Sequence, residues 1–190
     1  MNQNAMPSIW KAQDGIVNPE LFEAQEIKIL WILREPNGEN FDFMKYLRDP
    51  TVYKRWKASY GLVVKLSYAI FNNLQNHASI PNPSKNVKEI MPKIALINIK
   101  KTGGKSTINP KKITKSASEE QDQIANQIIE INPDVIIFGG TKKYLSNQTL
   151  DKIRECIKKP VKIISNYHPN QKKITHKEYL DRALASFHSN

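Results

Sequence analysis

Two polar residues that could form a chemical site, an acid and an amide, each stand at the end of an apolar run. Glu35 follows the nearly continuous apolar stretch 27–33 within REPNG, and Asn98 stands near the end of IALINI, residues 94–99. A carboxylate at such a corner can orient or deprotonate water, and an amide can read an edge that carries both donors and acceptors. Each has a structural alternative, since Glu35 can pair with Arg34 or cap a helix and Asn98 can satisfy a backbone group.

Two further corners follow later in the chain. Gly139 and Gly140 come after the apolar run 135–138, and another backbone could approach closely there. His168 lies in the loop after the run 161–164, where a lone histidine is structural as readily as functional.

Helical patterns alternate with the four apolar runs. The runs 27–33, 94–99, 135–138 and 161–164 predict strands, and short helices at 19–24 and 41–48 and longer ones at 56–76, 118–131, around 150–157 and 175–187 separate them. Parallel pairing needs helical crossovers, so we expect a three-layer α/β/α fold with a central four-stranded parallel sheet. Residues 1–190 form one domain in this interpretation, with an arm and short helix at 1–26 and the α/β core at 27–187.

Local signals place several boundaries. Ser118 with Gln121 and Thr175 with Glu178 are typical of capping boxes that begin helices, and the Pro- and Asn-rich segment 77–87 is expected to be a loop. If the four strands run parallel, their carboxyl ends bring Glu35, Asn98, Gly139 with Gly140, and His168 to one edge, where open α/β sheets bind ligands.

The charge favours a polyanionic partner. The formal net charge is +11, and between residues 85 and 115 nine lysines stand against one acid, Glu89. Nucleic acid attracts charge of this sign, although a solvated lysine face is equally compatible with the pattern. We expect DNA, single- or double-stranded, or RNA as the partner, with no membrane contact and a monomeric protein.

Several chemistries lack their signatures. The sequence TGGKST departs from a nucleotide-binding phosphate loop because Ile99 occupies the first glycine position, although Lys105 and the glycines could still receive a phosphate. The four histidines have no ligand-like spacing, and there is no GxSxG elbow. The single cysteine, Cys156, is expected to be buried in a helix. We therefore expect no metal and no cofactor and, without a signal peptide at the start, a cytoplasmic protein.

The order of the four corners resembles that of the uracil-DNA glycosylase superfamily. Members follow the first core strand with a motif such as GEAPG, GQDPY or GMNPG, end the second strand in asparagine, close a later strand with glycine and finish another in HPS. The counterparts here are REPNG, ALIN followed by IKK, VIIFGG and YHPN, between Ile27 and Phe187. The chain departs from the pattern at Arg34, where the family has glycine, and at Asn170, where it has serine.

The resemblance implies roles for individual residues. Glu35 matches the residue that assists water attack on the sugar C1′, Asn98 the amide that reads the base, and His168 the histidine that stabilises the leaving base. The remaining candidates for contact with the base are Tyr60, which is the favoured stacking aromatic, Arg34, Gly38 and Phe41. The candidate contacts with DNA phosphates are Lys100, Lys101, Lys105, Asn170 and Lys172.

The resemblance implies hydrolysis of the N-glycosidic bond of uracil or another damaged or deaminated base in DNA. Two alternatives stay open at this point. One is a nucleic-acid-binding module of the same fold in which Arg34 fills the base pocket, and the other is a hydrolase for a small nucleotide or nucleoside.

Overall fold

The chain folds around a five-stranded, mostly parallel sheet. The computed structural model describes residues 14–34, 43–49, 57–81, 83–101 and 110–189. The strands are β1 (Gly15–Ile16), β2 (Ile29–Leu33), β3 (Ala95–Asn98), β4 (Val135–Gly139) and β5 (Lys162–Asn166). Their spatial order is β1-β3-β2-β4-β5, in which β2 to β5 run parallel and only β1 is antiparallel to its neighbour. The expected α/β class and the four parallel strands are confirmed.

The expected number of strands in the sheet is wrong, because the sheet has a fifth strand, β1. β1 lies in the segment 1–26 that the sequence assigned to an arm and a short helix, and it pairs with the outer side of β3. Ile16 is buried there. A strand is predicted from sequence by the alternation of its side chains, and two residues are too few to show it, so no local pattern predicted β1.

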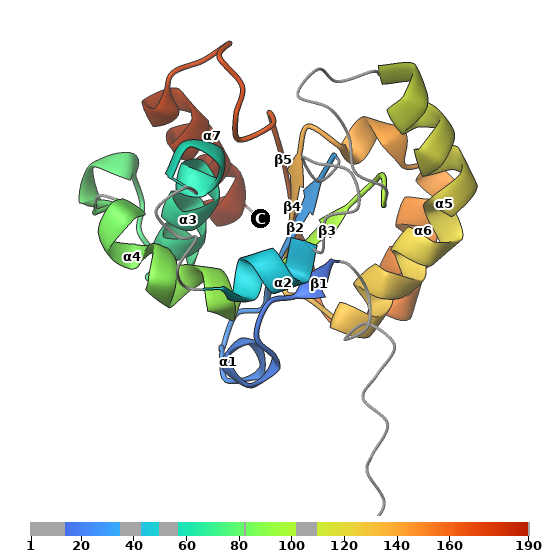
Figure 1. Ribbon diagram of the computed structural model, residues 1–190, viewed down its shortest axis with the longest axis horizontal. Helices are drawn as coiled ribbons and strands as arrows, with labels where there is room; N and C mark the ends of the chain where they lie inside the picture. Colours follow the sequence, from blue (N-terminus) through green and yellow to red (C-terminus); the bar gives the residue numbers. More distant parts are fainter. Residues whose placement is uncertain (1–13, 35–42, 50–56, 82, 102–109, 190) are drawn as a thin grey trace, which may run out of the picture.

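Helices cover both faces of the sheet. Figure 1 shows α3 (Lys57–Phe71), α4 (Pro83–Ile90) and α7 (His176–His188) on one side and α5 (Pro110–Ile131) and α6 (Asn147–Cys156) on the other. The shorter helical elements are α1 (Pro19–Glu23), α2 (Phe43–Arg48), η3 (His77–Ser79), η4 (Met91–Lys93) and η5 (Lys142–Tyr144). None of the helices among the described residues is long and apolar enough to cross a membrane.

Alternation along the strands builds two separate cores. Trp31 and Leu33 face the layer of α3 and α7, whereas Leu30 and Ile32 face the layer of α5 and α6. All four side chains are buried, which explains why β2 reads as a continuous apolar run. The indole N–H of Trp31 donates to Ser67 Oγ at 2.9 Å, so its one polar atom is satisfied inside the core.

Two helix predictions are wrong. The segment 77–87, expected to be a loop, contains η3 and most of α4, and α4 places Pro83 in its first turn, where proline's missing N–H costs nothing. The long helix before β4 begins at Pro110 and not at Ser118, which lies inside it. Pro110 is again a favourable first residue, and Ile113 continues the buried stripe upstream.

Of two further local predictions, the one for the start of α7 is confirmed and the one for Cys156 is wrong. The capping box of Thr175 and Glu178 is confirmed, since each side chain accepts from the other's backbone N–H at the start of α7. Cys156, expected to be buried, is exposed at the end of α6. The buried stripe of that helix passes through Leu150 and Ile153 and leaves the cysteine outside.

Candidate functional site at the carboxyl edge of the sheet

The strand pairings bring the predicted corners to one edge. Leu33 pairs with Asn98 across β2 and β3, and Gly139 pairs with Asn166 across β4 and β5. The loop that carries His168 therefore leaves the sheet beside Gly139, at the upper side of the sheet in Figure 1. Four candidate residues, Glu35, Gly38, Phe41 and Lys105, lie outside the described residues.

Arg34 is fixed where the two central strands end. The N–H of Ile99 donates to Leu33 O and the N–H of Lys100 donates to Arg34 O, both at 2.9 Å, so ladder pairing continues past the end of β3. Arg34 thus stands at the middle of the sheet, between the end of β3 and the end of β4. Its backbone position is set by main-chain bonds and not by its side chain.

Two glycines let the histidine loop close onto this edge. A Cβ on Gly139 would lie 2.9 Å from Leu33 Cδ2 and 3.1 Å from Pro169 Cδ. A Cβ on Gly140, whose φ is +71°, would lie 3.1 Å from the backbone N of His168 and 3.3 Å from Arg34 Nη2. The missing side chains therefore leave room for the loop and for the Arg34 guanidinium against the end of β4.

His168 is held neutral with its proton on a defined nitrogen. Burial, helped by the positive charge of Arg34, lowers its pKa to about 4. The backbone N–H of Asn170 donates to His168 Nδ1 at 3.2 Å. Because Nδ1 accepts, the neutral ring carries its hydrogen on Nε2, which is then available as a donor. Asn170, predicted to contact phosphate, serves here to set the tautomer of His168.

Two buried donors at this edge have no partner within the described residues. Asn98 is 2% exposed, and its Nδ2 makes no hydrogen bond. The Nε of Arg34 is also buried without a partner. A buried donor left unsatisfied costs roughly 1–3 kcal/mol, so a ligand with acceptor atoms would remove a penalty that the free protein carries.

The end of β3 is anchored by a buried ionic cluster around Asp14. Its carboxylate accepts from the backbone N–H of Asn98 at 2.7 Å, from Lys101 Nζ at 3.0 Å and from Gln127 Nε2 at 2.9 Å. Lys101 also donates to Gln127 Oε1 at 2.6 Å, and its side chain is only 16% exposed. The ammonium of Lys101 is therefore occupied within the fold, and the phosphate contact predicted for it stays a prediction.

For three other predicted residues the structure gives the element or loop and the burial. Tyr60 lies in α3, partly buried and packed against the core on the α3 and α7 side. Lys100 is partly buried just past β3, and Lys172 is exposed in the loop after β5. These positions are compatible with the expected contacts, and the roles themselves stay predictions.

Sequence reasoning missed polar and aromatic groups beside this edge. Thr141 is fully buried and donates through Oγ1 to Ile32 O at 2.7 Å, which ties the turn after β4 to β2. Lys143 lies over the ring of Tyr144, and Lys173 lies near the ring of Tyr167. In the sequence these lysines and tyrosines stand together in the stretches KKY, residues 142–144, and NYHPNQKK, residues 166–173. Only the second stretch contains residues that the sequence analysis predicts to be functional.

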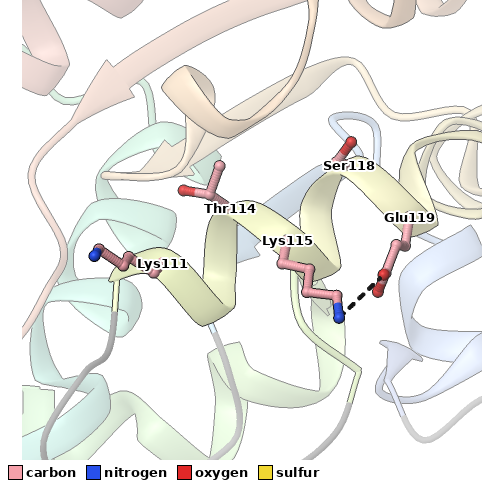
Figure 2. Close-up of a pocket in the computed structure, with 5 residues that line it drawn as sticks. All are labelled: Lys111, Thr114, Lys115, Ser118 and Glu119. Carbon is pink, nitrogen blue, oxygen red and sulfur yellow. Dashed lines mark ion pairs between the residues drawn. The ribbon is translucent and has the colours of Figure 1, made fainter.

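An open depression runs along the first half of α5. Figure 2 shows its lining side chains, which come from successive turns of α5: Lys111, Thr114, Lys115, Ser118 and Glu119. Lys115 and Glu119 form an ion pair at 3.8 Å across it. In the part of the chain that the structure describes, no group of three or more histidine, cysteine or acidic residues could hold a metal ion.

The fold and this edge define an α/β protein whose candidate ligand site lies at the carboxyl ends of a mostly parallel sheet. Comparison with protein-family models and with curated proteins found no match to this chain. Function therefore has to be argued from the site.

Proposed function

We propose that the protein is a DNA glycosylase-like hydrolase that cleaves the N-glycosidic bond of uracil or another deaminated or damaged base in DNA. The observation that carries the proposal is a set of donors at one sheet edge that have no partner among the described residues: Asn98 Nδ2, Arg34 Nε and the Nε2 of neutral His168. Oxo-bases present carbonyl oxygens that can accept from such donors. A cytoplasmic location also stays a prediction.

The proposed reaction uses these groups at defined atoms. Water attacks C1′ of the sugar while the bond from C1′ to the base nitrogen breaks, and its electron pair passes to the departing base. His168 donates from Nε2 to an oxygen of that base, where negative charge accumulates, and Arg34 adds positive charge beside it. Glu35 orients the water and accepts its proton, and Asn98 holds the polar edge of the flipped base.

A preset neutral histidine suits this role. A donor already oriented by Asn170 needs no rearrangement when charge develops on the base, and a ring with its pKa near 4 keeps one acceptor and one donor nitrogen at neutral pH. Arg34 disfavours protonation of the same ring, so the pair supplies one fixed positive charge and one neutral donor rather than two repelling cations.

One observation favours an alternative of the same fold. The guanidinium of Arg34 lies against Gly140 and the backbone of His168, at the place where a flipped base would have to enter. If the guanidinium fills that space permanently, the protein is a nucleic-acid-binding module without chemistry. A hydrolase for free nucleosides would use the same donors but need no basic surface around them.

The test is base excision on defined oligonucleotides. Single- and double-stranded oligonucleotides carrying uracil, hypoxanthine or xanthine are incubated with the protein and treated with alkali, which breaks the strand at abasic sites. Breaks with at least one substrate, reduced in Glu35→Gln, are expected. Absence of breaks with every substrate would overturn the enzymatic proposal, and tighter saturable binding of a free nucleoside than of any oligonucleotide would favour the third alternative.

A further inference from the structure

Lysines at the two edges of the sheet have different partners. At the amino edge, where the strands begin, each of three lysines lies against a carboxylate. These ion pairs are Lys28 with Glu23, Lys93 with Glu89 at 3.4 Å and Lys159 with Asp134 at 2.7 Å. The positive charge of that edge is largely balanced within the protein.

At the carboxyl edge Lys101, past β3, pairs with Asp14, whereas the two segments after β4 and β5 are basic without such compensation. The turn 139–146 after β4 carries Lys142 and Lys143, the loop 166–175 after β5 carries Lys172 and Lys173, and neither segment contains an acid. Within the described ranges, none of these four lysines forms an ion pair with a carboxylate. The charge they carry is therefore available to a polyanion.

Aromatic rings lie among these lysines. Lys143 Nζ is 5.2 Å from the ring centroid of Tyr144, and Lys173 Nζ is 5.9 Å from that of Tyr167. Arg182, on α7, brings its Cζ to 5.6 Å from the Tyr167 ring. Tyr167 is 37% exposed although its backbone is anchored, since its carbonyl accepts from the hydroxyl of buried Tyr179 at 3.1 Å. The Tyr167 ring is therefore held at the surface beside two cations, Lys173 and Arg182.

The two loops leave neighbouring strands and meet at the candidate site. The N–H of Gly140 donates to Asn166 O at 2.7 Å, so the segment with Lys143 and the segment with Tyr167 begin side by side. The backbone of His168, in the same loop as the second lysine pair, lies against Gly140. A strand bound along this edge would therefore pass the candidate site.

We propose that the Lys143–Tyr144 and Lys173–Tyr167 pairs form a binding surface for single-stranded DNA, which holds the nucleotides on either side of the site. The lysines contact phosphates and the exposed ring of Tyr167 stacks on an unpaired base, which a duplex keeps stacked inside the helix. The proposal deepens the proposed function by naming the strand form of its substrate. It rests on that function only for the reason why the protein binds DNA.

The experiment measures binding of an undamaged oligothymidine by fluorescence anisotropy across a salt series. For a single strand the slope of log K against log salt changes by about 0.7 for each phosphate contact, so K143Q/K173Q should flatten the slope by about 1.4. The matched control K88Q/K158Q removes two exposed lysines away from this edge, with the same change of net charge, and should leave the slope unchanged. Equal flattening by both pairs would overturn the proposal.

A second variant tests the ring. Tyr167→Leu keeps the backbone hydrogen bond to Tyr179 and removes the aromatic face, so single-strand affinity should fall roughly five-fold or more with the salt slope unchanged. Duplex of the same length should bind more weakly and be insensitive to this change. Equal loss on single strand and duplex would overturn the strand preference.

The outcomes separate this surface from the proposed chemistry, because undamaged DNA binds without being cleaved. If binding behaves as expected and no base is excised, the surface stands and the glycosylase proposal fails. If bases are excised while K143Q/K173Q leaves the slope unchanged, the chemistry stands and the surface is wrong.

Discussion

Asp14 offers the sharpest test of how the site is positioned. Its carboxylate, only 4% exposed, meets Lys101, Gln127 and the backbone N–H of Asn98. Asp14→Ala removes the shared acceptor, so the largely buried ammonium of Lys101 loses its counter-charge and the backbone N–H of Asn98 loses its acceptor. The change therefore acts on the strand end that presents the Asn98 amide.

The expected cost follows from that burial. Removing one partner of a buried ion pair costs roughly 3–5 kcal/mol, because the other charge is left uncompensated. Lys101 keeps 16% of its side chain exposed, so partial hydration places the loss at the lower end, about 3 kcal/mol. In a domain of this size each kcal/mol shifts Tm by roughly 2–4 °C, which predicts a fall of about 6–12 °C.

Thermal unfolding of four proteins measures the effect: the wild type, Asp14→Ala, Lys101→Met and the double variant. The double variant removes both charges, so its Tm should lie above the value obtained by adding the two single losses. A fall of less than about 2 °C in Asp14→Ala, or strict additivity, would show that the cluster does not hold the strand end as described.

Two further predictions concern the histidine loop. Since the folded pKa of His168 is about 4 and the ordinary pKa of histidine is 6.5, the unfolded chain binds more protons between these values, so stability should rise by at most about 3 kcal/mol from pH 4 to pH 6.5. Urea unfolding across that range should show this rise in the wild type and a smaller one in His168→Gln. Gly140→Ala should lose about 1–2 kcal/mol from its φ of +71° alone, and the new Cβ should also displace the loop. A wild-type Tm in Gly140→Ala, with unchanged amide shifts for His168, would contradict the close approach.

The parts of the fold that were predictable have local causes. β2 is buried on both faces, so its side chains form one apolar run that turns polar where the strand ends. The cap of α7 needs only Thr175 and Glu178, three residues apart. Parallel order then follows from the intervening helices, and with it the convergence of Asn98 and the His168 loop.

The misses have physical reasons as well. Pro83 and Pro110 were read as loop residues, whereas each begins a helix in which proline's missing N–H is harmless. Lys101 was counted as available positive charge because its partner Asp14 lies 87 residues away in sequence. Pairings of that separation leave no periodic or motif signal, so the ionic anchor of Asn98 required the structure.

The central claim is that neutral His168 donates from Nε2 to a departing base. Single-turnover excision on the best substrate oligonucleotide, comparing the wild type with His168→Leu, tests it most directly, with exposed His176→Leu as the matched control. Loss of one preorganised donor to a developing negative charge lowers rates by roughly 10²–10³-fold, and we expect a fall of that order in His168→Leu and wild-type rates in His176→Leu. Equal rates in all three proteins would contradict the account.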